Sequence, residues 1–168
     1  FHPEVVHTEQ GTEILKNFVL KVCGAKQDWT MEGFIDAAVE KISKIEGNVL
    51  CGVSGGIDST VAALLIHKAI GNRQKCVFVN NGLLRLNEEI EIEEMFKNNF
   101  NVNFSVVDAA QVFLAELKGV EDPERKRMII GEEFVRVYTE FAKKNGPFKW
   151  LAQGTLYPDV IESGVSKG

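Results

Sequence analysis

From residue 48 onward, short apolar runs alternate with longer segments whose apolar residues recur every three to four positions. Short runs are typical of buried strands, and the longer period is typical of amphipathic helices. The predicted strands are 49–53, 75–79, 102–107 and 150–152. The predicted helices are 58–70, 88–97, 109–117 and 123–144. Asn87 is the expected N-cap of the second of these helices, and Pro123 stands in the first turn of the fourth. Continuously apolar strands separated by helices predict an α/β fold, a doubly wound parallel sheet covered on both faces.

Two further helices are expected ahead of the first strand. Residues 10–22 place their apolar side chains on one helical face, and Gly24 follows as a stop signal. Thr30 is a suitable N-cap for a second helix, which Gly47 ends. The segment 24–29 between these helices is the predicted linker.

Composition excludes some classes of protein. The 168 residues are 45% hydrophobic and 26% charged, which is typical of a globular protein and not of a disordered or fibrous one. A net charge of −5 disfavours binding through phosphate neutralisation, so we expect no nucleic-acid partner. No apolar run approaches the roughly 18–20 residues that span a bilayer, so we expect no membrane partner.

The three cysteines, Cys23, Cys51 and Cys76, have no zinc-binding spacing. Cys51 and Cys76 lie within apolar strand-like runs, where we expect them to be buried as small hydrophobic residues. An odd number of unpatterned cysteines is typical of a reducing compartment, so the sequence predicts a cytoplasmic protein.

A glycine-rich turn joins the first predicted strand to its helix. It reads Ser54, Gly55, Gly56, Ile57, Asp58, Ser59 and Thr60. Adjacent glycines let the backbone approach an anion closely, and a helix N-terminus presents free N–H groups to phosphate oxygens. The three hydroxyls of the turn can add hydrogen-bond donors. The Asp58 carboxylate would repel phosphates unless a cation lay between them, which indicates Mg²⁺.

The order of residues in this turn distinguishes it from other nucleotide-binding loops. Neither Gly-x-Gly-x-x-Gly nor Gly-x-x-x-x-Gly-Lys-Ser/Thr occurs, which disfavours a dinucleotide Rossmann site and a Walker-type loop. A plain Gly-Gly turn with a helix cap is the simplest structural alternative. Ser-Gly-Gly-x-Asp-Ser resembles the pyrophosphate-binding loop of the N-type ATP pyrophosphatases, which cleave ATP between its α- and β-phosphates. The resemblance implies an adenine nucleotide alpha hydrolase-like fold.

Three further segments resemble the pyrophosphatase domain of the GMP synthases within that superfamily. They read FVNNGLLR at 78–85, ERKR leading to IIG at 124–131, and WLAQGTLYPDVIES at 150–163. Asn80 departs from the pattern, because related enzymes commonly carry Asp there. The opening residues 1–4, FHPE, resemble the last catalytic motif of class I glutamine amidotransferases, in which His and Glu complete a triad with a distant cysteine.

This resemblance implies a domain organisation. Residues 1–23 would be the C-terminal tail of a glutamine amidotransferase domain, with His2 and Glu4 as the remnant of its triad. Residues 24–168 would be the ATP pyrophosphatase domain, without the C-terminal dimerisation domain of the GMP synthases. Because no cysteine has the setting of the nucleophile, we expect no glutamine hydrolysis by this chain.

The resemblance also implies a reaction and its ligands. The C2 oxygen of xanthosine monophosphate (XMP) would be adenylated by ATP with release of pyrophosphate, and ammonia from glutamine would then displace AMP to form GMP. The turn 54–60 would hold the β- and γ-phosphates, with Mg²⁺ on Asp58. The full-length protein would be a homodimer, and this chain alone would bind nucleotide without efficient synthesis.

The remaining implied site residues fall into two groups. Val79 and Phe134 would flank the adenine, although an apolar helix position packed on the sheet explains Phe134 equally well. Four others would line the nucleotide pocket: Gln153, Gly154, Thr155 and Asp159. A basic run would hold substrate phosphate or a lid, or else form a solvated helix face: Arg125, Lys126 and Arg127.

Two alternatives stay open. Another N-type ATP pyrophosphatase, of the tRNA-thiolation or NAD synthetase type, would share the loop. The tRNA-modifying enzymes, however, commonly need reactive cysteines and basic surfaces, which are not visible here. A nucleotide-binding module without catalysis is the second alternative, and the intact loop at 54–60 argues against it.

Overall fold

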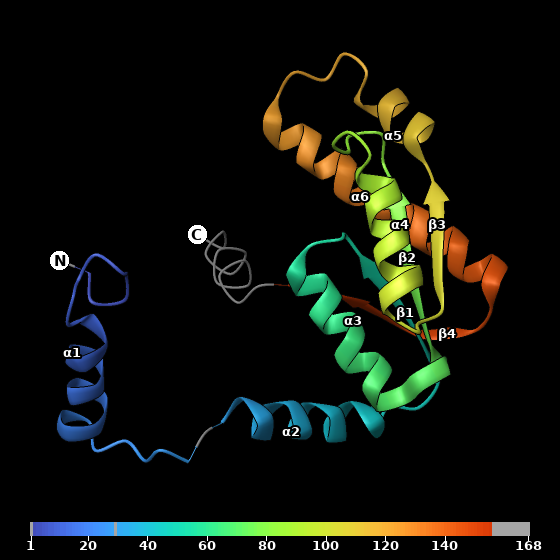
Figure 1. Cartoon of the computed structure of the whole chain (residues 1–168). Coiled ribbons are helices and arrows are strands. Elements are labelled where there is room, and N and C mark those ends of the chain that lie inside the picture. The colour runs from blue at the N-terminus through green and yellow to red at the C-terminus, as the bar shows by residue number, and fades with distance from the viewer. Residues whose placement is uncertain (1, 29, 156–168) are drawn as a thin grey trace, which may run out of the picture. The chain divides into compact units, whose positions relative to one another are not determined.

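The computed structural model describes residues 2–28 and 30–155 (Figure 1). The chain divides into two compact units, Phe1–Ala37 and Ala38–Gly168. In the first unit, α1 (Gly11–Asn17) continues into a π-helical turn, η1 (Phe18–Val22). This matches the helix that the apolar pattern predicts.

The division between the units falls within α2 (Met31–Ser43). The Thr30 hydroxyl accepts a hydrogen bond from the Gly33 backbone N–H at 3.1 Å, so the predicted N-cap is confirmed. The predicted boundary between residues 23 and 24 stays a prediction.

A four-stranded parallel sheet with the order β3-β2-β1-β4 organises the second unit. Its strands are β1 (Asn48–Val53), β2 (Gln74–Asn80), β3 (Phe104–Asp108) and β4 (Phe148–Gln153). Its helices are α3 (Ile57–Ile70), the 3₁₀ turn η2 (Gly71–Arg73), α4 (Glu88–Asn99), α5 (Ala110–Leu117) and α6 (Pro123–Asn145). Each strand and helix predicted for this unit is present, with ends that differ by a few residues at most.

Side chains alternate between the two faces of the sheet, as the strand period of two requires. On one face Leu50, Val77 and Val79 join a core with residues of α5 and α6. On the other face Cys51, Cys76 and Phe78 join a core with residues of α3 and α4. Helices therefore cover both faces (Figure 1), and the predicted doubly wound α/β fold is confirmed.

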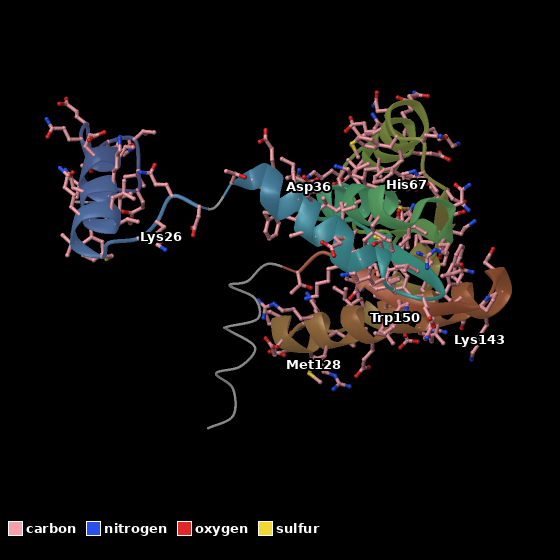
Figure 2. The ribbon with its side chains drawn as sticks, turned by 90° about the horizontal axis from the view of Figure 1, so that it is seen from below. Lys26, Asp36, His67, Met128, Lys143 and Trp150 are labelled. Atoms are coloured by element: carbon pink, nitrogen blue, oxygen red, sulfur yellow. The ribbon has the colours of Figure 1, made fainter. Side chains whose placement is uncertain are left out.

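The edge strand β4 is packed less tightly than the strands beside it. Trp150 on β4 is half exposed, and its indole N–H donates to the Glu46 carbonyl at 2.9 Å. Figure 2 shows Trp150 together with Met128 and Lys143, which lie toward opposite ends of α6. Within residues 2–28 and 30–155, no helix is both long and apolar enough to cross a bilayer.

The chain reverses its direction across the sheet at β1. It proceeds outward from β1 through β2 to β3, and then returns through α5 and α6 to β4 on the other side of β1. In open α/β sheets, ligands bind outside the carboxyl ends of the strands at such a switch point. We therefore expect a ligand site at the carboxyl ends of β1 and β4.

The buried positions of Cys51 and Cys76 confirm the sequence interpretation of both residues. They are 1% and 0% exposed, and they are register partners on β1 and β2. Both are free thiols. The hydrogen bond with Cys51 and burial raise the pKa of the Cys76 thiol above its ordinary value.

We expect alkylation to separate these thiols from the exposed Cys23. Iodoacetamide at neutral pH should label Cys23 alone in the folded chain, because Cys51 and Cys76 are both inaccessible and the raised pKa of Cys76 also keeps its thiol protonated. Peptide mass spectrometry should find Cys51 and Cys76 labelled only after denaturation. Labelling of Cys76 in the folded chain at the rate of Cys23 would contradict its buried position.

Candidate functional site

A cavity of about 320 Å³ opens at the carboxyl ends of β1, β2 and β4. Its lining residues are Gly52, Val53, Ser54, Ser59, Phe78, Val79, Asn81, Leu84, Phe134, Tyr138, Gln153 and Gly154. This volume lies at the lower end of the range of small-molecule sites, roughly 300–1,000 Å³. The lining combines small polar residues with aliphatic and aromatic ones, so the cavity suits a ligand with a polar end and a flat apolar end.

Two residues of the glycine-rich turn, Ser54 and Ser59, line the cavity between β1 and the start of α3. The other residues of the turn lie outside the lining: Gly55, Gly56, Ile57, Asp58 and Thr60. Gly55 has φ +79°, a conformation that favours glycine. A Cβ atom built on Gly55 would also collide with the Ile92 side chain. Glycine is therefore required at this position for two independent reasons, backbone conformation and space.

The hydroxyl of Ser59 holds the turn in shape. It accepts a hydrogen bond from the Ser54 backbone N–H at 3.1 Å and donates to the Gly56 carbonyl at 3.0 Å. The Thr60 hydroxyl donates to the same carbonyl at 2.9 Å. Two of the three predicted phosphate donors thus use their protons within the turn. The Ser54 hydroxyl accepts from the Gly56 N–H at 3.4 Å and lies 3.1 Å from the Ser59 hydroxyl.

Gly154 brings the end of β4 against the start of α3. A Cβ atom built on Gly154 would lie 3.1 Å from both the backbone N and the Cα of Ser59. Gln153, the residue before it, pairs in register with Gly52 on β1. The register of β1 and β4 therefore places two predicted pocket residues beside the glycine-rich turn.

The apolar wall contains the two residues predicted to flank a base. Val79 and Phe134 both line the cavity. Phe134 also packs against the core, with its ring 4.9 Å from that of Phe113 in an edge-on arrangement. The structural and the functional interpretation of Phe134 are therefore compatible.

Tyr138 is a cavity residue that the sequence interpretation did not include. Its ring lies 6.1 Å from that of Phe134, one helical turn earlier on α6. The spacing of four residues was a usable signal, because it places both rings on one helical face. The lining also includes Asn81 and Leu84, which belong to the quoted FVNNGLLR segment but had no assigned role.

Asn80 lies at the end of β2, outside the lining of this cavity. Its side-chain amide donates to the Glu89 carboxylate on α4, and its carbonyl oxygen accepts from the Gly82 N–H at 2.9 Å. An aspartate at this position would place a second carboxylate against Glu89. Asparagine at position 80, where the family pattern has aspartate, therefore avoids repulsion from Glu89 on α4.

Asp58 lies in the first turn of α3, next to the glycine-rich turn, and is exposed. Among the described residues, no group of three or more His, Cys, Asp or Glu side chains could hold a metal ion. Mg²⁺, however, is commonly held by one or two carboxylates together with substrate phosphates and water. One exposed carboxylate beside a glycine-rich turn at a helix N-terminus fits that type of coordination.

The other predicted residues lie outside the cavity lining. Thr155 is exposed, and Asp159 lies outside the described residues. The basic run 125–127 occupies the first turns of α6, where Arg127 pairs with Glu124 at 2.6 Å on the surface. In the first unit, His2 Nδ1 lies 2.9 Å from Glu4 Oε1, and both side chains are exposed.

Comparison with known families identifies the domain. The sequence model of the NAD synthase family matches residues 29–141, which is more than half of the chain. The chain belongs to the NAD synthase family.

Curated relatives of this chain include GMP synthases. It is 57% identical to the glutamine-hydrolysing GMP synthase of Caldicellulosiruptor saccharolyticus, over 99% of this chain and 33% of that protein. It is 55% identical to that of Haemophilus influenzae, over 99% of this chain and 32% of that protein. The chain thus spans about a third of the length of the relatives it matches. The predicted homology to the GMP synthases and the N-type ATP pyrophosphatase domain are confirmed.

Solved structures of NAD synthase family members share the fold. The glutamine-dependent NAD⁺ synthetase of Acinetobacter baumannii, in complex with ADP, has a TM-score of 0.56 and 18% identity, over 79% of this chain and 26% of that one. The NH₃-dependent NAD synthetase of Campylobacter jejuni has a TM-score of 0.52 and 17% identity, over 79% and 69% of the two chains. At this level of identity the likeness concerns the fold alone, and the adenine nucleotide alpha hydrolase-like fold is confirmed.

Proposed function

We propose that this chain is the ATP-binding pyrophosphatase part of an enzyme that makes GMP from XMP, ATP and glutamine-derived ammonia. The observation that carries the proposal is the junction of β1, α3 and β4, where the glycine-rich turn meets Gly154 at one end of the cavity. Whole-chain similarity to GMP synthases supports this choice over an NAD synthetase or a tRNA-modifying enzyme.

Different residues of the cavity would bind the phosphates and the adenine of ATP. Backbone N–H groups at the start of α3 and the Ser54 hydroxyl would hold the β- and γ-phosphates. Val79 and Phe134 would enclose the adenine from two elements. Gln153 and Gly154 would close the side next to β4. The α-phosphate would then face the cavity mouth, where the XMP oxygen can attack it.

The same turn would favour the departure of pyrophosphate. Negative charge grows on the leaving group as the bond to the α-phosphorus breaks, and fixed N–H dipoles stabilise that charge. Asp58 would hold Mg²⁺, which offsets charge on the phosphates when bound. The AMP left on the XMP oxygen would then be displaced by ammonia.

The wider assignments rest on the same proposal. His2 and Glu4 would belong to the glutaminase triad of a longer protein, whose nucleophilic cysteine lies elsewhere in its chain. Residues beyond this third of the relatives' length would complete the XMP site and the homodimer. A cytoplasmic location is proposed from the cysteine pattern. This chain should accordingly bind ATP without making GMP efficiently.

Calorimetry of Mg²⁺–ATP binding tests the proposal. Ser59→Ala should weaken binding by about tenfold, because it removes the acceptor for the Ser54 N–H and loosens the turn. The matched control is Ser43→Ala, whose hydroxyl donates to the Glu40 carbonyl at 2.8 Å on the exposed face of α2. Equal ATP affinity in the wild type and Ser59→Ala would overturn the site, and tRNA binding in place of ATP binding would favour the rival enzyme class.

A further inference from the structure

The Tyr138 hydroxyl is a polar group without a hydrogen-bond partner in an otherwise apolar part of the cavity. Tyr138 is 7% exposed. Among the residues that the structure describes, none forms a hydrogen bond with this hydroxyl. Among the described residues, the fully buried side-chain polar atoms without a partner are His67 Nδ1 and Gln74 Oε1. The Tyr138 oxygen is not one of them, so it is accessible at the cavity surface, where a ligand can reach it and supply the missing hydrogen bond.

The contact between Tyr138 and Gly52 indicates where the Tyr138 hydroxyl lies. A Cβ atom built on Gly52 would lie 2.6 Å from the Tyr138 oxygen, and Gly52 lines the cavity. A separate groove between α6 and β4 also includes Tyr138 but is lined by Leu50 instead of Gly52. The hydroxyl end therefore belongs to the nucleotide cavity. The absence of a side chain at Gly52 provides its space.

The ring next to Tyr138 fixes the part of a ligand that would meet this hydroxyl. Phe134 stacks at 6.1 Å with an interplanar angle of 25°. Ser54 and Ser59 lie at the phosphate end of the same cavity, and Val79 belongs to its apolar part. A nucleotide with its base against Phe134 and Val79 would present its ring edge, and not its phosphates, to Tyr138.

We propose that Tyr138 recognises the base, with its hydroxyl donating a hydrogen bond to a ring nitrogen of the adenine. The inference rests on the proposed function and adds a specificity-determining residue to it. Burial raises the pKa of Tyr138 to about 12, so the phenol stays protonated and able to donate throughout the physiological range. The ring nitrogens of adenine are acceptors, which matches a group with one proton to give.

The test combines Tyr138→Phe with ATP analogues that lack one ring nitrogen. Calorimetry with Mg²⁺ should show ATP binding weakened by about tenfold in Tyr138→Phe, and inorganic pyrophosphate binding unchanged. Among 1-deaza-, 3-deaza- and 7-deaza-ATP, one analogue should bind the wild type about tenfold more weakly than ATP does. The affinity of that analogue should be the same for Tyr138→Phe and for the wild type. Such non-additivity identifies a direct contact.

The matched control is Thr139→Val, which deletes the neighbouring hydroxyl on α6. Thr139 donates to the Val135 carbonyl at 2.7 Å and lies outside the cavity lining, so its loss should not change ATP affinity. The melting temperature of unliganded Tyr138→Phe should not fall, because no internal hydrogen bond is lost.

The outcomes separate the two proposals. Equal ATP affinity in the wild type and Tyr138→Phe, or losses that add for all three analogues, would overturn the role of Tyr138 alone. Failure of the wild type to bind either ATP or pyrophosphate would overturn the nucleotide site and the inference together.

Discussion

Replacing Gly55 by alanine is expected to lower the free energy of unfolding by about 2–5 kcal/mol and to abolish measurable ATP binding. The backbone at Gly55 has φ +79°, which costs roughly 1–2 kcal/mol for a residue with a Cβ atom. The new methyl group would also collide with Ile92, and overpacking of this kind typically costs about 1–3 kcal/mol. The turn can relieve both effects only by moving away from the shape that we propose for phosphate binding.

Chemical denaturation and calorimetry measure the two effects of Gly55→Ala separately. Gly131→Ala is the matched control, because this helical glycine in α6 has no atom near the position of an added Cβ. That control should keep its ATP affinity and gain about 0.5–1 kcal/mol of stability. Wild-type stability and affinity in Gly55→Ala would contradict both the strain and the role of the turn.

Replacing Asp58 by asparagine is expected to weaken ATP binding only when Mg²⁺ is present. With the metal present, affinity should fall by about 100-fold, since a charged ligand of the cation is lost. With the metal removed by chelation, affinity should stay equal or rise, because a carboxylate beside the phosphates is repulsive. A purely structural role for Asp58 would change both affinities in the same direction.

The control for Asp58→Asn is another carboxylate at the same edge of the sheet. Asp108 ends β3, the outer strand, where its side chain accepts from the Ala110 N–H at 3.1 Å. It lies two strands away from β1 and outside the glycine-rich turn, so Asp108→Asn should leave the Mg²⁺ dependence of ATP affinity unchanged. Identical calorimetric titrations for Asp58→Asn and the wild type would refute metal binding at Asp58.

Much of the fold could be predicted because burial imposes its period directly on the sequence. Cys76, Val77 and Phe78 form a continuous apolar run because both faces of β2 are buried, one beneath α3 and α4 and the other beneath α5 and α6. Pro123 and the Asp122 cap, which accepts from the Arg125 N–H at 2.8 Å, fix the start of α6 locally. Such signals need no knowledge of distant contacts.

Other features depend on contacts that no local pattern carries. Asn87 was predicted to cap α4, and it stands at that position, but in a left-handed conformation and without a side-chain cap bond. The Glu88 carboxylate instead accepts from the Arg85 N–H at 2.8 Å. The approach of Tyr138 to Gly52 likewise depends on how α6 lies over the sheet. The glycine-rich turn was recognisable because its requirement for glycine and hydroxyl residues is local.

The pairing of β1 with β4 has a consequence for how the chain acquires its activity. The glycine-rich turn is complete early in the sequence, whereas Gly154 comes only after β2, β3 and their crossover helices. Contacts between such distant segments form slowly, because a long loop must close before they contribute. During synthesis on the ribosome, the growing chain would therefore contain the whole glycine-rich turn before β4, which forms one side of the cavity, had been made. Affinity for nucleotide would therefore be a measure of whether β4 has paired with β1.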